Sequence, residues 1–326
     1  MDFDRDNFRP PWYLRNGHVQ TILNSQGPKK HRAGKIARSL QSQRLTLEAK
    51  DGVKLLADFD RAPVGKGALV VLIHGWEGSS QSSYQLTTAA TLLNMGFDVL
   101  RLNLRDHGDS HHLNPGLFNS TLTGEASEAI GHFLAMRSYP WVCLAGYSLG
   151  GSFALRIAAD AGAELGITAV AAVCAPIEPC NAMRALNEGW FVYERYFFRK
   201  WTRSLHRKLQ HFPQLEYGDD LKKARRLDDI NRMFIPAHTP YRDAEEYFAA
   251  YALSGKRLIN LSMPAWLVLA ADDPIIPVAD VSNIAAEVPL QIQVTRHGGH
   301  CGFIENLRGD SWIEKWLVEL FTTCLD

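Results

Sequence analysis

The sequence predicts an α/β fold with a mostly parallel central sheet, helices on both faces and an inserted helical cap. Apolar runs of strand length alternate with stretches of helical length from about residue 68 to residue 174, and the alternation resumes near residue 263. Such alternation is typical of parallel strands joined by helices. The second observation is a Gly-Tyr-Ser-Leu-Gly pentapeptide at residues 146–150, which lies between an apolar run and a helix-like stretch. It predicts a sharp turn from strand to helix.

The elements follow in order along the chain. Residues 1–40 contain two prolines and a basic run, and we expect them to form an irregular arm laid over the main domain, which spans residues 41–326. Two strands separated by Lys50-Asp51-Gly52 predict an antiparallel hairpin. The expected elements are the hairpin strands 45–49 and 53–59, strand 68–73, helix 84–95, strand 98–103, helix 122–137, strand 141–145, a helix after Ser148, strands 167–174, 266–271 and 291–295, and helix 312–324.

The alternation breaks after residue 174, and this interval predicts a cap at approximately residues 178–258. Several of its aromatic side chains share helical spacing. Two interpretations stand: the aromatic face packs on the core, or it forms an apolar wall or interfacial surface near a substrate pocket. The second interpretation predicts an apolar roof made of Trp190, Phe191, Phe197, Phe198 and Trp201.

Ser148, at the centre of the pentapeptide, is the best candidate nucleophile in the chain. A serine hydroxyl becomes nucleophilic when a tight turn presents it to a histidine that can take its proton. The alternative for Ser148 is an ordinary helix N-cap, a position that serine favours. The order that this architecture requires is serine, then acid, then histidine.

Candidate partners for Ser148 follow in that order. The strand at residues 266–271 runs into Asp272 and Asp273, either of which could orient a histidine. The strand at residues 291–295 runs into a glycine-rich loop that contains His297 and His300. Three strand ends therefore point to one site of nucleophilic catalysis.

The strand at residues 68–73 ends in a glycine turn, which can aim a backbone N–H at a developing oxyanion. We expect His74, just before this turn, to be a hydrogen-bonded structural residue. Glu77 and Arg105 are expected to be loop charges exposed to water. A zinc site is the alternative for one loop, since imidazole and carboxylate are ordinary zinc ligands. That loop contains His107, Asp109, His111 and His112.

The chain resembles the α/β-hydrolases, and more narrowly their YheT-like branch, which is similar to bacterial esterases and eukaryotic ABHD-type lipid hydrolases. The resemblance spans nearly the whole chain and rests on residues 8–22, 74–79 and 271–274. It implies a serine esterase or lipase-like carboxylic ester hydrolase that works through an acyl-enzyme, with no metal and no cofactor. Its catalytic triad would be Ser148, Asp273 and His300.

The resemblance also orders the alternatives for individual residues. It favours Asp273 over Asp272 as the acid, and His300 over His297, which we expect at the surface. The oxyanion donors would be the backbone amides of Trp76 and Leu149. The chain departs from the family at Arg105-Asp106, where many relatives have an Arg-Gly pair, and this difference bears on the substrate more than on the reaction.

Composition narrows the classes of function. Lys plus Arg and Asp plus Glu are equal at 35 each, so no basic field of the kind that nucleic acid requires is present. The five cysteines lack C-x-x-C spacing, which indicates neither a disulfide framework nor a thiol zinc site. No stretch approaches the length of a membrane span, and the acidic start has no signal-peptide character. We therefore expect a cytoplasmic enzyme.

The substrate is expected to be a small ester or a lipid-like molecule with an apolar acyl chain. The sequence leaves open a thioesterase or acyltransferase with the same triad, and a non-catalytic binding protein that keeps the fold. It also leaves open peripheral membrane contact and the oligomeric state.

Overall fold

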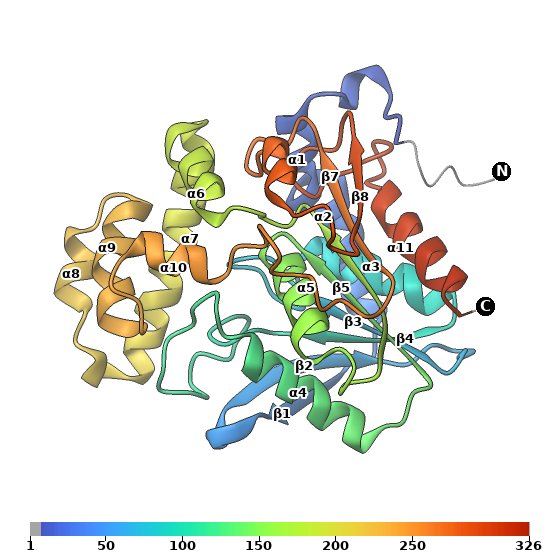
Figure 1. Ribbon diagram of the computed structural model, residues 1–326, viewed down its shortest axis with the longest axis horizontal. Coiled ribbons are helices and arrows are strands. Elements are labelled where there is room, and N and C mark those ends of the chain that lie inside the picture. Colours follow the sequence, from blue (N-terminus) through green and yellow to red (C-terminus); the bar gives the residue numbers. More distant parts are fainter. Residues whose placement is uncertain (1–7, 326) are drawn as a thin grey trace.

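The computed structural model describes residues 8–325 and places their strands in one eight-stranded sheet, in the order β1-β2-β4-β3-β5-β6-β7-β8 (Figure 1). β1 pairs with β2, and β2 with β4, in antiparallel fashion, and the remaining pairs are parallel. The strands are β1 (Gln43–Glu48), β2 (Lys54–Asp60), β3 (Ala68–Ile73), β4 (Phe97–Leu102), β5 (Trp141–Tyr147), β6 (Ile167–Val173), β7 (Ala265–Ala270) and β8 (Gln291–Thr295).

The central strands are apolar throughout because helices cover both faces of the sheet. In β3, Val70 and Leu72 face the cluster that includes α3 and α11, whereas Leu69 and Val71 face the cluster that includes α4 and α5. The helices are α3 (Ser83–Asn94), α4 (Thr123–Met136), α5 (Leu149–Ala161) and α11 (Trp312–Thr323). Every element expected between residues 68 and 174 is present, with ends shifted by no more than two residues.

The amino-terminal arm differs from the expectation of irregular structure. It forms α1 (Gly17–Ser25) and α2 (Gly27–Ser39). The side chain of Asn16 starts α1 by accepting hydrogen bonds from the amides of His18 and Val19. α2 is mostly polar, so its sequence has no apolar stripe that would predict a packed helix.

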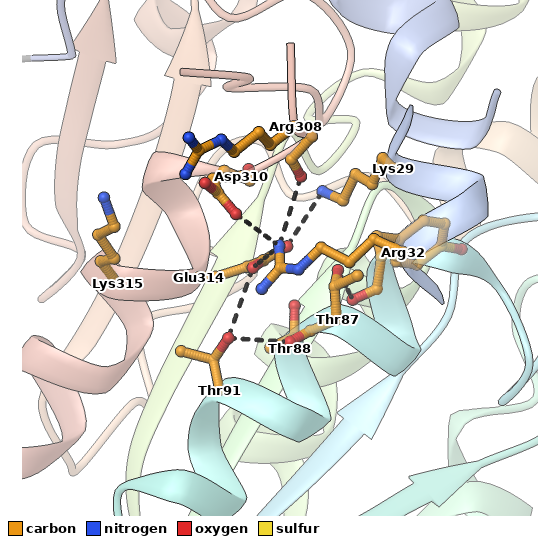
Figure 2. Close-up of polar contacts among 12 residues, drawn as sticks. Lys29, Arg32, Thr87, Thr88, Thr91, Arg308, Asp310, Glu314 and Lys315 are labelled. Carbon is orange, nitrogen blue, oxygen red and sulfur yellow. Dashed lines mark hydrogen bonds and ion pairs between the residues drawn. The ribbon is translucent and has the colours of Figure 1, made fainter. Parts of the chain in front are cut away.

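Buried charges fasten α2 to the rest of the domain (Figure 2). Lys29 is almost fully buried and pairs with Glu314 of α11 at 3.4 Å. Arg32 donates to the second oxygen of the same carboxylate at 3.0 Å. Removing one partner of a buried pair leaves an uncompensated charge, which typically costs about 3–5 kcal/mol. These contacts explain how a polar helix becomes a fixed part of the fold.

A helical insertion separates β6 from β7 and projects from one end of the sheet (Figure 1). It agrees with the predicted cap, whereas the proposed boundaries at residues 178–258 and the division at residue 40 stay predictions. The cap helices are α6 (Pro179–Glu188), α7 (Phe191–His211), α8 (Gly218–Lys223), α9 (Leu227–His238) and α10 (Ala244–Ala250).

No helix in residues 8–325 is long and apolar enough to cross a membrane. Short 3-10 helices occur at Trp12–Leu14, Lys50–Gly52, Pro213–Leu215 and Val278–Asn283.

Candidate active site

Ser148 lies on a tight turn between β5 and α5. Its backbone has φ 54° and ψ −125°, a conformation that non-glycine residues rarely adopt. A side chain on Gly146 would overlap the carbonyl oxygen of Gly150, and one on Gly150 would overlap the backbone of Ile73 and His74. The pentapeptide therefore needs glycine at both ends because the turn presses against itself and against the end of β3.

The structure brings Ser148, His300 and Asp273 together from the loops that follow β5, β8 and β7. His300 Nε2 lies 2.9 Å from Ser148 Oγ, and His300 Nδ1 lies 2.9 Å from Asp273 Oδ2. The other oxygen of Asp273 accepts hydrogen bonds from the amides of Ile275 and Ile276, at 2.8 and 3.0 Å. These contacts hold the carboxylate in one orientation toward the imidazole.

The rival acid and histidine form a separate pair. Asp272 Oδ1 accepts a hydrogen bond from the amide of Gly299 at 2.8 Å, and its other oxygen lies 3.5 Å from His297 Nδ1. Asp272 thus helps to shape the loop before His300 without touching that imidazole. His297 is half-buried rather than fully at the surface, since its side chain is 21% exposed.

Opposing effects act on the imidazole of His300. Burial lowers the pKa of His300, but the Asp273 carboxylate and the neighbouring Cys301 both raise it, and together they hold that pKa well above its ordinary value. An imidazolium formed at this position is therefore stabilised. This is the property that a general base needs after it has removed a proton.

The turn after β3 lies directly beside Ser148. A side chain on Gly75 would come within 3.2 Å of Ser148 Cβ. Within residues 8–325, the amides of Trp76 and Leu149 donate to no protein acceptor, so both remain available to an oxyanion. The geometry is compatible with the predicted oxyanion donors, whose role stays a proposal.

Two buried histidines hold this turn in place. His74 Nδ1 donates to the carbonyl of Gly75 at 2.8 Å, and its Nε2 accepts from the amide of Leu104 at 3.1 Å. His107 Nε2 accepts from the amide of Glu77 at 3.1 Å. Burial lowers the pKa of His74 well below its ordinary value and that of His107 to about 4, so both are neutral near pH 7. His74 is thus a hydrogen-bonded structural residue, as expected.

Asp109 and His111 of the histidine-rich loop both contact side chains of α7. His111 Nε2 lies 2.8 Å from Ser204 Oγ of α7, and the Asp109 carboxylate lies 3.5 Å from the guanidinium of Arg207. These contacts join the loop to the cap. The expectation that the enzyme needs no metal or cofactor stays a prediction.

The expectation that Glu77 and Arg105 are exposed to water is wrong. The Arg105 guanidinium pairs with the carboxylate of Glu125, and the two side chains are only 13% and 9% exposed. Glu77 is half-buried, and burial raises its pKa to about 7. Lys200 of α7 donates to the backbone carbonyl of Glu77 at 2.8 Å. The cap therefore covers this loop, which local sequence does not indicate.

Helix α1 supports the loop that contains His300. Thr21 Oγ1 accepts a hydrogen bond from the amide of His300 at 2.9 Å. The fully buried amide of Gln20 donates to the carbonyl of Ile304 at 3.1 Å and accepts from its amide at 2.6 Å. Sequence reasoning assigned no role to Gln20 or Thr21. Both residues lie in residues 8–22, one of the stretches on which the resemblance to the YheT-like branch rests.

Two cavities meet at Ser148 and His300. The first, of about 130 Å³, is lined mainly by apolar side chains from the core and the cap, including Trp76, Phe197, Trp201 and Ile276. The second, of about 810 Å³, is a groove whose lining includes Gln81, Lys200 and Arg203. Ser148 therefore lies between an apolar pocket and a more polar groove.

Some aromatic side chains of the cap line the cavity beside Ser148, and others pack on the core or are exposed. Phe197 stacks on Trp76 with ring centroids 5.1 Å apart, and Trp201 meets the same indole edge-on at 5.2 Å. Phe198 packs against the core. Trp190 and Phe191 line neither cavity and are 43% and 64% exposed. The predicted roof is therefore wrong for these two residues and for Phe198.

Comparison with known proteins agrees with this architecture. Residues 68–307 match the family described as alpha/beta hydrolase fold, so the chain belongs to that family. It is 26% identical to "Putative esterase YheT" of Escherichia coli K12, over 98% of this chain and 94% of the relative. It is 21% identical to mouse "Phospholipase ABHD3", over 73% of this chain and 59% of the relative. The structure of the Pyrococcus furiosus esterase Pf2001 superposes with a TM-score of 0.58 at 15% identity, covering 89% of this chain and 91% of that one.

Proposed function

We propose that this protein is a serine esterase that hydrolyses carboxylic esters with apolar acyl chains. The observation that supports the proposal most strongly is the continuous hydrogen-bonded series Ser148, His300 and Asp273, of which Ser148 and His300 line an apolar cavity. Two of the similar proteins are named as esterases and one as a phospholipase. An esterase is thus consistent with both the geometry and the names of the relatives.

The mechanism assigns a step to each group. His300 Nε2 removes the proton of Ser148 as Oγ attacks the ester carbonyl carbon, and Asp273 stabilises the resulting imidazolium. The amides of Trp76 and Leu149 hold the oxyanion, and the amino terminus of α5 adds a modest favourable dipole. His300 then protonates the departing alcohol. A water molecule deprotonated by His300 attacks the acyl carbon and releases the acid.

The two cavities suggest how the ester lies across Ser148. The acyl chain would enter the apolar pocket between Trp76, Phe197 and Trp201, and the alcohol would leave through the polar groove. Each buried methylene contributes up to about 0.8 kcal/mol of binding, equivalent to roughly a fourfold gain. The value of kcat/KM should therefore rise from acetyl to longer esters by up to about fourfold per methylene until the pocket is full.

A series of p-nitrophenyl esters of graded acyl length tests this proposal. Phe197→Ala and Trp201→Ala should flatten the dependence on chain length while acetyl ester hydrolysis changes little, because the triad lies on loops of the sheet. Phe191→Ala is a matched control, since this aromatic residue of the same helix lies outside both cavities. A wild-type profile that peaks at acetate and falls steeply would contradict the apolar acyl chain and leave a small ester as the substrate.

A further inference from the structure

Two cysteines lie beside His300 in the interior. Cys174 follows β6 and Cys301 follows His300, and both are buried. Their Sγ atoms and a ring nitrogen of His300 lie within 4.8 Å of one another. The amide of Cys301 donates to Cys174 Sγ at 3.3 Å, which fixes one loop against the other. The mechanism proposed above uses neither thiol.

We propose that Cys174, Cys301 and His300 form an inhibitory binding site for the zinc ion. Two cysteines and one histidine are a set of donors that zinc binds in proteins, with bond lengths of about 2.3 Å to sulfur and about 2.0 Å to nitrogen. Tetrahedral bonds of these lengths place the donor atoms about 3.5–4 Å apart. The three donor atoms lie within 4.8 Å of one another, so they would have to approach by up to about 1 Å to reach these separations.

The charge balance of the site also favours a divalent cation. Zinc binds thiolates, so each thiol loses its proton to solvent as its sulfur coordinates the ion. His300 coordinates through a neutral ring nitrogen, so a proton on that nitrogen also leaves to solvent. Two thiolates then neutralise the dication, so the ion and its three ligands together carry no net charge. An ion could approach through the polar groove, whose lining includes Ser148, His300 and Cys301.

Zinc at this site would compete directly with catalysis. The two ring nitrogens of His300 lie at hydrogen-bonding distance from Asp273 and Ser148. An ion on Nε2 would occupy the lone pair that accepts the serine proton, and an ion on Nδ1 would break the contact with the acid. The sequence spacing gave no sign of the site because its two cysteines lie 127 residues apart.

A binding experiment that does not depend on turnover tests the site. Ser148→Ala removes the nucleophile and keeps all three donors. Titration of this variant with cadmium should give a thiolate charge-transfer band that saturates at one ion per chain, and zinc should displace the cadmium. Adding Cys174→Ser or Cys301→Ser should weaken the affinity at least tenfold, and adding Cys180→Ser, an exposed thiol, should not change it. Where a serine variant fails to fold, as judged by circular dichroism, the alanine variant replaces it.

No saturable band, or a band that survives loss of both cysteines, would overturn the proposal. A second arm measures activity and rests on the proposed esterase function. A zinc concentration that slows the wild type tenfold should slow Cys301→Ser less than twofold relative to its own zinc-free rate, and EDTA should restore the wild type. Equal inhibition of the two proteins would refute the inhibitory role. If neither the wild type nor Cys301→Ser hydrolyses esters, the esterase proposal fails. The cadmium and zinc titration still decides whether the three residues bind zinc.

Discussion

Replacing Asp273 by asparagine tests the assigned acid, because the surroundings of this carboxylate dictate how the amide would sit. Asp273 Oδ1 accepts two backbone N–H groups, and its Oδ2 faces His300 Nδ1. An asparagine that keeps the first contacts must turn its NH₂ group toward His300. The reverse orientation would leave two amide donors unpaired, at about 1–3 kcal/mol each. The first orientation is therefore favoured.

In that orientation the amide donor faces Nδ1, so the imidazole must carry its proton on Nε2. His300 can then no longer accept the proton of Ser148. A wrong tautomer of this kind lowers kcat by about 10⁴-fold in serine proteases, or about 5 kcal/mol. We expect a loss of this size for Asp273→Asn with a p-nitrophenyl ester, with circular dichroism and the thermal midpoint reporting that the variant is folded.

Asp272→Asn is the matched control. Its amide oxygen can still accept from Gly299, and the side chain does not touch His300, so we expect kcat within about threefold of the wild type. If Asp272→Asn lost as much activity as Asp273→Asn, or more, the assignment of the acid would be wrong by one residue.

Three further predictions concern pH, loop position and metal. The neighbouring carboxylate raises the pKa of His300, and only the neutral imidazole accepts a proton. The value of kcat/KM measured in EDTA should therefore fall as the pH decreases, with an inflection above pH 6.5. An inflection below pH 6 would contradict this electrostatic account. Thr21→Val removes the acceptor for the His300 amide and should lower kcat about tenfold, whereas Thr21→Ser should keep most activity, as steady-state assays of both would show. Activity should survive EDTA and phenanthroline because the triad needs no metal, and strong chelator inhibition reversed by zinc would show a metal requirement.

The parts of the site that sequence predicted are those fixed by short-range constraints. The pentapeptide around Ser148 reports a turn in which neighbouring backbone segments nearly touch, and only glycine fits at its ends. The strands before Asp273 and His300 are short apolar or alternating runs that end in turn residues. Because parallel strands present their carboxyl ends at one edge of the sheet, the loops that follow these strands lie at the same edge.

The parts that sequence reasoning missed depend on long-range contacts between polar groups. The hydrogen bond from His300 to Thr21 joins residues 279 apart, and no local pattern reports it. The burial of Glu77 follows from the packing of α7 over its loop. Helix α2 lacks an apolar stripe because Lys29 and its ion pair with Glu314 take the place of apolar packing.

The most direct test of the central claim is covalent labelling of Ser148. A fluorophosphonate probe should form a single adduct that mass spectrometry places on the peptide containing Ser148, and Ser148→Ala should lose both the adduct and ester hydrolysis, by several orders of magnitude in kcat. A folded Ser148→Ala protein that retains esterase activity would contradict the account. A wild-type protein that neither labels nor turns over any ester would indicate a binding protein that keeps the fold.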